Sequence, residues 1–161
     1  MTLAVCPGSF DPVTLGHVDV VRRARMIFDE VVVAVANNPA KTYRFGPAQR
    51  ADLARDAVAD LDGVRVDVVD GLLADYCDDV GATAVVKGIR GPADLDAEHA
   101  MALMNRHLAG VETVFVLGDP TLAHVASSLV KDVARNGGDL TGLVTPAVAG
   151  ALGDADQGED R

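Results

Sequence analysis

Short runs of apolar residues recur along the chain, and most of them are continuous rather than alternating with polar residues. Five such runs, rich in Val and Ala, occupy residues 3–6, 31–36, 64–69, 82–86 and 113–117. Unalternated apolar runs of this length are typical of parallel strands that are buried on both faces. The pattern therefore predicts five β-strands.

Segments with apolar residues at helical spacing follow each of these runs. They occupy residues 18–28, 47–61, 72–80, 92–108 and 127–136. Strand and helix alternate throughout, which is typical of an open parallel sheet with right-handed crossovers. The sequence predicts an α/β fold, namely a single-domain, Rossmann-like, doubly wound parallel five-stranded sheet with helices on both faces.

The length and composition fit one globular domain. The chain has 161 residues, of which 49% are hydrophobic and 24% charged, and a chain of this size can bury a substantial core. We expect the domain to span residues 1–150. Residues 151–161 are mostly small, acidic or polar, and we expect them to form a disordered acidic tail.

The charge balance limits the classes of partner. Fourteen basic residues against 24 acidic ones give a net charge of −10, which argues against a protein that coats nucleic acid or an anionic membrane. Cys6 and Cys77 form no CxxC motif, so neither a disulfide framework nor a zinc site is expected. The first residues do not resemble a signal peptide, and no apolar run approaches the roughly 18 residues that span a bilayer. We therefore expect a soluble, cytoplasmic protein.

The few lysines lie where a ligand is expected. Of three lysines, Lys41 and Lys87 follow the second and fourth predicted strands, and Arg44 and Arg90 come shortly after them. Ligands of open α/β sheets bind beyond the carboxyl ends of the strands. This placement indicates an anion-binding site at that edge, although long cationic side chains also favour loops for solubility alone.

The loop after the first strand, residues 6–17, has the features of a phosphate-binding loop. Gly8 and Gly16 allow close approach of a ligand to the backbone, and the following helix presents its N-terminal N–H groups. His17, at the start of this helix, can donate a ring N–H to a phosphate oxygen while staying neutral. In the alternative interpretation, Thr14 or His17 only caps the helix.

Several motifs in this chain match a known enzyme family. Thr14-Leu15-Gly16-His17 matches the T/H-x-G-H signature of the nucleotidylyltransferase superfamily, and residues 7–17 more narrowly resemble bacterial phosphopantetheine adenylyltransferases. The resemblance covers residues 2–150. Further segments match in the same order: Asn38-Pro39-Ala40-Lys41, Lys87-Gly88-Ile89-Arg90 and Ser127-Ser128-Leu129-Val130-Lys131-Asp132-Val133.

The resemblance implies a reaction. Enzymes of this family use magnesium and transfer AMP from ATP to 4′-phosphopantetheine, which yields dephospho-coenzyme A and pyrophosphate during coenzyme A synthesis. The acceptor phosphate attacks the α-phosphorus in line, so catalysis consists of positioning and charge stabilisation. The resemblance also implies a homohexamer and coenzyme A as a product-type inhibitor. No protein side chain is identified as a metal ligand.

The resemblance also implies roles for individual residues. His17 is expected to stabilise the transition state. For Glu98 a solvated helix face, and for Leu73 a place in the core, are alternatives that the sequence leaves open. The substrate-binding residues implied are Ser9, Lys41, Leu73 and Lys87, and the ATP-binding residues are Ser9, Phe10, His17, Gly88, Ile89, Arg90, Glu98, Val125, Ser127 and Ser128.

This chain departs from the family where adenine is expected to bind. The family usually has Asp-Phe-Glu-Tyr-Glu in its acidic helix, whereas this chain has Asp94-Leu95-Asp96-Ala97-Glu98. A later loop that is usually aromatic reads Leu122-Ala123-His124-Val125-Ala126 here. We assign no role to Leu122, Ala123, His124 or Ala126.

Two other functions stay open at the level of sequence. A related nucleotidylyltransferase acting on another phosphate acceptor would share the Thr14–His17 motif, but the residue 7–12 context with Lys41 and Lys87 favours the pantetheine phosphate. A non-catalytic sensor of adenine nucleotide or coenzyme A would not need His17, Lys41 and Arg90 together. A structural subunit without a ligand is disfavoured by the clustered cations.

Overall fold

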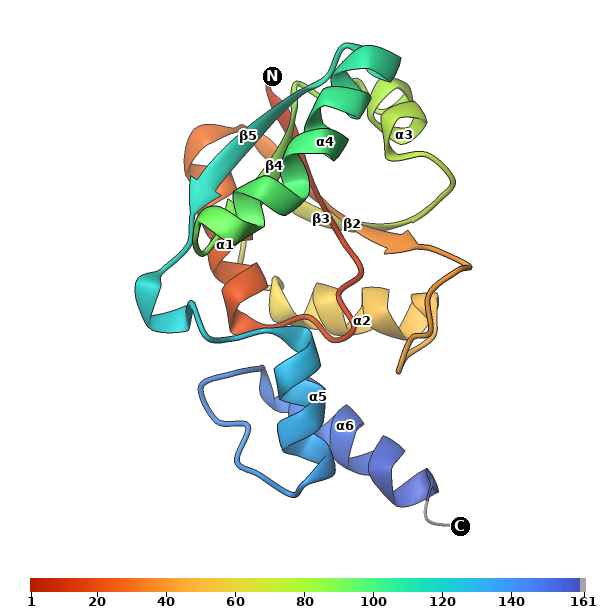
Figure 1. Cartoon of the computed structure of the whole chain (residues 1–161), viewed down its shortest axis with the longest axis vertical. Coiled ribbons are helices and arrows are strands. Elements are labelled where there is room, and N and C mark those ends of the chain that lie inside the picture. The colour runs from red at the N-terminus through yellow and green to blue at the C-terminus, as the bar shows by residue number, and fades with distance from the viewer. Residues whose placement is uncertain (160–161) are drawn as a thin grey trace.

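A five-stranded parallel sheet forms the centre of the molecule (Figure 1). The computed structural model describes the backbone of residues 1–159 and the side chains of residues 1–155. The strand order is β3-β2-β1-β4-β5, and every neighbouring pair is parallel. The predicted sheet is confirmed, with the strands at β1 (Leu3–Gly8), β2 (Glu30–Asn37), β3 (Val64–Asp70), β4 (Ala84–Ile89) and β5 (Glu112–Leu117).

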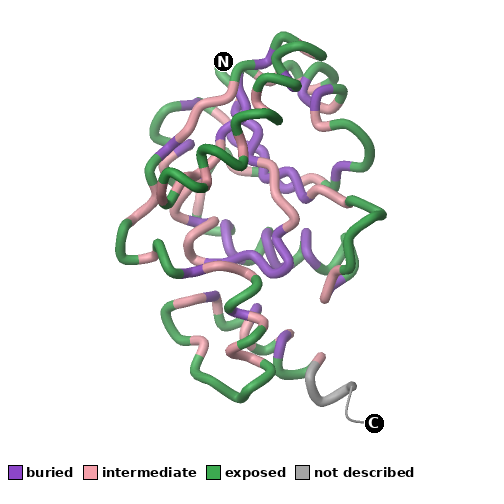
Figure 2. The backbone as a smooth tube through the Cα atoms, viewed as in Figure 1, coloured by how far each residue is buried: buried purple, intermediate pink, exposed green. Residues whose placement is uncertain are grey.

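Helices cover both faces of the sheet, as predicted. In β2, Val31, Val33 and Val35 pack in one core cluster with α1 and α2, while Val32 and Ala34 pack in a second cluster with α3 and the end of α4. Successive side chains of a strand point to opposite faces, so the buried strands of Figure 2 contribute to both clusters. The helices are α1 (Leu15–Ile27), α2 (Pro47–Ala57), α3 (Leu73–Asp79), α4 (Pro92–Ala109), α5 (Ser127–Arg135) and α6 (Pro146–Glu159), with a 3₁₀ turn at Pro120–Leu122.

The C-terminal helix α6 was not predicted, and it changes the expected domain boundary. Val148 and Leu152, one helical turn apart, are fully buried and belong to the same cluster as Val130 of α5. Glycines and aspartates lower the intrinsic helix propensity of this segment, but tertiary packing of its apolar side compensates. The tail expected from residue 151 is thus helical to Glu159, and residues 160–161 lie outside the described part of the chain.

The strand order places a crevice between the ends of β1 and β4. The chain runs outward from β1 to β2 and β3 on one side, then returns to β4 and β5 on the other. Loops that follow neighbouring strands with diverging connections leave a crevice in which ligands of this fold class bind. Helices α5 and α6 lie beyond this edge of the sheet (Figure 1).

Candidate active site

A cleft of about 290 Å³ opens at the carboxyl ends of β1 and β4. The N-terminal ends of α1 and α5 and the first turns of α4 border it. The structure thus brings together residues from segments that are far apart in the sequence. The predicted site residues that line this cleft are Phe10, His17, Lys87, Gly88, Ile89, Arg90, Glu98, Val125 and Ser127.

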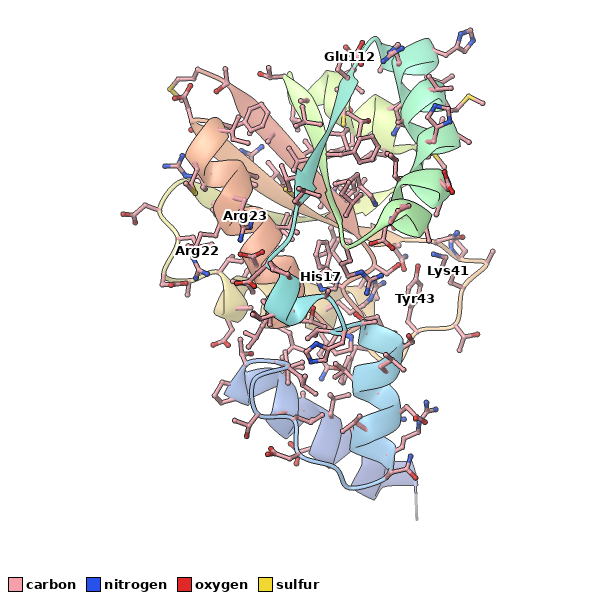
Figure 3. The ribbon with its side chains drawn as sticks, turned by 60° about the vertical axis from the view of Figure 1, so that its left-hand side comes forward. His17, Arg22, Arg23, Lys41, Tyr43 and Glu112 are labelled. Carbon is pink, nitrogen blue, oxygen red and sulfur yellow. The ribbon has the colours of Figure 1, made fainter. Side chains whose placement is uncertain are left out.

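Four predicted site residues are not among the residues that line the cleft. Ser9 is next to it, between Gly8 and Phe10 in the loop after β1, and Ser128 is exposed on α5. Lys41 is exposed on the loop between β2 and α2 (Figure 3). Leu73 lines a smaller depression of about 30 Å³, which shares Pro7, Lys87 and Glu98 with the cleft.

His17 caps helix α1 and also lines the cleft, so the two interpretations of this residue are compatible. The Thr14 backbone N–H donates to Nδ1 of His17 at 3.0 Å, and the His17 backbone N–H donates to the Thr14 hydroxyl at 3.3 Å. Because Nδ1 accepts a hydrogen bond, the neutral ring carries its proton on Nε2. The Phe10 ring packs edge-on against the imidazole, with the ring centroids 5.0 Å apart.

The surroundings of His17 keep its ring neutral. Burial, followed by the positive charges of Arg90 and Lys87, lowers the pKa of His17 from 6.5 to about 4. The ring is therefore an uncharged N–H donor at neutral pH, fixed in one orientation by its bond to Thr14. Burial raises the pKa of the Cys6 thiol, which also lines the cleft, to about 12, so this thiol is not a nucleophile at neutral pH.

The protonation state of His17 can be measured directly. In an NMR titration of the free protein, we expect the His17 ring to titrate near pH 4 and to show the Nε2–H tautomer at pH 7. A ring that titrates close to 6.5, or that carries its proton on Nδ1, would contradict the assigned geometry.

Two cations reach the cleft, and each is held by a carboxylate. The Arg90 guanidinium donates to Asp94 from Nε at 3.0 Å and from Nη2 at 3.3 Å, and the hydrogen bonds from Arg90 lower the pKa of Asp94. Lys87 Nζ lies 3.2 Å from Oε1 of Glu98. Acidic residues of α4 thus orient Lys87, near the end of β4, and Arg90, directly after it.

The start of helix α5 provides backbone donors for an anion. Its N-cap residue is Ala126, whose methyl group cannot accept from the first N–H groups of the helix. The Ser127 hydroxyl donates to the carbonyl of Pro12 at 2.8 Å and so attaches α5 to the loop after β1. The N–H groups of this first turn and the helix dipole favour a phosphate group here.

The cleft also contains residues that the sequence did not single out. Asp19 of α1 accepts from Arg23 Nε at 2.9 Å and from the Asp119 backbone N–H at 2.7 Å, and both Asp19 and Asp119 line the cleft. No motif marks the contact between Asp19 and Asp119, since these residues are 100 positions apart. Of the positions that lack the family's aromatic residues, Ala97 and Leu122 line the cleft, whereas Leu95 and His124 are not among its lining residues.

No group of three or more His, Cys, Asp or Glu side chains among the described residues is arranged to hold a metal ion. Within the same part of the chain, no helix is both long and apolar enough to cross a membrane.

The fold and the sequence place the chain in a known class of enzymes. Residues 5–133 match the cytidylyltransferase-like family. A putative nicotinate-nucleotide adenylyltransferase from Vibrio parahaemolyticus has the same fold, with a TM-score of 0.64 and 18% sequence identity over 94% of this chain and 99% of that one. The protein is therefore a nucleotidyltransferase of the cytidylyltransferase-like class.

Curated relatives define the family more narrowly. The phosphopantetheine adenylyltransferase of Bifidobacterium longum is 55% identical over 96% of this chain and 95% of its own length. That of Kocuria rhizophila is 57% identical over 96% of this chain and 99% of its own length. This chain belongs to the phosphopantetheine adenylyltransferase family, as the motifs indicated.

Proposed function

We propose that this protein transfers AMP from ATP to the phosphate of 4′-phosphopantetheine, forming dephospho-coenzyme A and pyrophosphate. The observation that carries this proposal is a neutral histidine, His17, held at a helix N-terminus beside Lys87 and Arg90 in the cleft between β1 and β4. The full-length similarity to enzymes of that name supports the choice of substrates. The sensor function is not favoured, because these close relatives are named as transferases.

The nucleotide binds across the crevice, with its phosphates at the helix N-termini. Arg90 and the first N–H groups of α1 and α5 neutralise the phosphate charges. The Nε2–H of His17 donates to an oxygen of the α-phosphate, where negative charge increases as the transition state forms. The other residues assigned to ATP are the backbone at Ser9 and Phe10 together with Gly88, Ile89, Glu98, Val125, Ser127 and Ser128.

The acceptor occupies the side of the cleft that adjoins the Leu73 depression. Lys87 borders both hollows, so it binds the acceptor phosphate while the pantetheine arm extends past Leu73. Lys41 and Ser9 approach from the other loops. A phosphate oxygen of the acceptor attacks the α-phosphorus, and the bond between that phosphorus and the β-bridging oxygen breaks, so pyrophosphate leaves with the bonding electrons.

Magnesium enters with the nucleotide. The described residues do not offer a set of carboxylates that fits a protein-held ion, so we propose that Mg²⁺ is bound by the ATP phosphates and water. When bound, the ion would screen the phosphate charge. We further propose that the protein assembles as a homohexamer and that coenzyme A inhibits it as a product-like ligand, as the family resemblance implies.

Pyrophosphate release with matched acceptors tests this function. We expect release from ATP and Mg²⁺ with 4′-phosphopantetheine, and none with nicotinamide mononucleotide, or with glycerol 3-phosphate and CTP. Release with either of the latter acceptors alone would establish a related transferase instead. If none of the three acceptors supports pyrophosphate release by a folded protein that binds ATP or coenzyme A, the sensor function would be established.

A further inference from the structure

The loop that carries Lys41 is internally ordered by hydrogen bonds. The backbone N–H of Ala40 donates to Asn38 Oδ1 at 2.9 Å, and that of Lys41 donates to the Asn38 carbonyl at 3.0 Å. The Asn38 backbone N–H in turn donates to the Tyr43 hydroxyl at 2.9 Å. Figure 3 shows Lys41 and Tyr43 on this loop, to one side of His17. These hydrogen bonds give the loop a defined shape.

A buried carboxylate connects this loop to the loop after β1. Asp11 is only 5% exposed, and its two carboxylate oxygens accept the backbone N–H groups of Arg44 and Phe45 at 2.8 and 2.9 Å. Lys131 of α5 donates to the same carboxylate at 3.1 Å. One side chain thus holds together the segments that carry Lys41, Phe10 and the start of α5.

A buried guanidinium makes a second connection between the same loops. Arg50 of α2 is fully buried, and its Nη1 donates to the carbonyls of Ser9 at 2.7 Å and Ala36 at 2.9 Å. Its Nε donates to the Phe45 carbonyl at 3.1 Å, so the Phe45 residue is bound by Asp11 at its N–H and by Arg50 at its C=O. The Tyr43 ring packs on the guanidinium, with its centroid 3.9 Å from Cζ of Arg50.

The buried charges of Asp11 and Arg50 fix the geometry of the loops more than they raise the free energy of unfolding. Neither Asp11 nor Arg50 is among the described residues that line the cleft. Burying a charge is costly, and well-packed apolar groups often stabilise a fold equally well. The fixed donors of Arg50 and the fixed acceptors of Asp11 hold the two loops in a single relative position.

We propose that Asp11, Tyr43 and Arg50, which we call the loop clamp, are positioning residues for the acceptor, acting through Lys41. The clamp fixes the loop between β2 and α2 against the loop after β1, so that the Lys41 ammonium reaches the acceptor phosphate. This inference rests on the proposed function, since it requires Lys41 to bind the acceptor. A displacement of about 1 Å in a positioning group can cost up to about 100-fold in rate.

The Asp11→Asn variant separates positioning from general stability. Asparagine keeps the size and one acceptor oxygen of aspartate. It carries no negative charge for Lys131 and cannot accept from the N–H groups of Arg44 and Phe45 with two oxygens. We expect the KM for 4′-phosphopantetheine to rise by about 10-fold, while the KM for ATP changes by less than about 2-fold.

The matched control is Arg25→Lys. Arg25 donates to the carbonyls of Asp62 and Phe28 at the opposite edge of the sheet, so its loss lowers the melting temperature and leaves both KM values unchanged.

Two further variants keep the test decisive. In a Lys41→Ala background, Asp11→Asn should raise the acceptor KM no further, because the clamp acts through Lys41. Tyr43→Leu removes the ring from Arg50 and the hydroxyl from Asn38 at a half-buried position. It should reproduce the acceptor-specific KM increase even if Asp11→Asn does not fold.

The outcomes are distinguishable. No turnover of 4′-phosphopantetheine by the unaltered protein overturns the proposed function and this inference with it. If the unaltered protein turns over 4′-phosphopantetheine, three results would overturn this inference alone. They are equal changes in both KM values, an unchanged acceptor KM in the Tyr43→Leu variant, and additive effects of Lys41→Ala and Asp11→Asn. An acceptor-specific increase that disappears in the Lys41→Ala background supports it.

Discussion

Replacing His17 with alanine is expected to lower kcat by about 100-fold or more and to change the ATP dissociation constant by less than about 3-fold. The reason is that the Nε2–H faces charge that grows on the α-phosphate only as the transition state forms. In the ground state, Arg90 and the helix N-termini supply most of the attraction for the triphosphate. Steady-state kinetics and calorimetric titration of ATP measure the two quantities separately.

A second variant separates the donor from the helix cap. In His17→Asn, the side-chain oxygen can still accept the Thr14 N–H that Nδ1 accepts in the native structure, but no donor remains at the position of Nε2. We expect this variant to keep the melting temperature nearer to that of the native protein and to lose as much kcat as His17→Ala. Normal turnover with a large loss of ATP affinity in either variant would refute the assigned role.

Replacing Lys87 with methionine is expected to lower kcat/KM for 4′-phosphopantetheine by about 100-fold, mainly through a higher acceptor KM. Lys87 borders both hollows of the site, and its removal leaves the Glu98 carboxylate without its cation at 3.2 Å. An unpaired negative charge then faces an anionic substrate. Varying each substrate at saturating concentrations of the other measures the effect.

The Lys87→Met variant is also expected to change the pKa of His17, which NMR measures independently of the kinetics. Lys87 is one of the two cations that lower the pKa of His17, so in Lys87→Met the His17 ring should titrate above its native value of about 4. Arg65→Met is the matched control, since Arg65 is a cation at the start of β3 that pairs with Glu30 and Asp67 outside the cleft. An unchanged His17 pKa, or an equal loss of activity in Arg65→Met, would contradict the placement of Lys87.

Local patterns predicted the central strands β1, β2 and β4 because consecutive residues of these strands are buried, on both faces of the sheet. The valine runs around Val32 and Val85 mark such strands independently of what packs on them. Helix α6 escaped prediction for the opposite reason. Its glycines and aspartates oppose helix formation, and only the burial of Val148 and Leu152 against distant segments compensates.

The candidate site was predictable to the extent that its residues belong to continuous motifs. His17, Lys87 and Arg90 occur in short segments with a recognisable order, and the structure places all three around one cleft. The roles of Asp11 and Arg50 depend instead on contacts with residues 34 and 41 positions away. No periodicity or spacing in the chain encodes such contacts, so only the folded structure shows them.

Following the α-phosphate of ATP tests the central claim most directly. The protein is incubated with Mg²⁺, 4′-phosphopantetheine and ATP labelled at the α-phosphorus, and the label is located by chromatography and mass spectrometry. We predict that the label moves into a product with the mass of dephospho-coenzyme A, in equal amount to the pyrophosphate released, and that none stays on the protein. Label retained in ATP, released as free AMP or attached to the protein would contradict direct transfer between two bound phosphates.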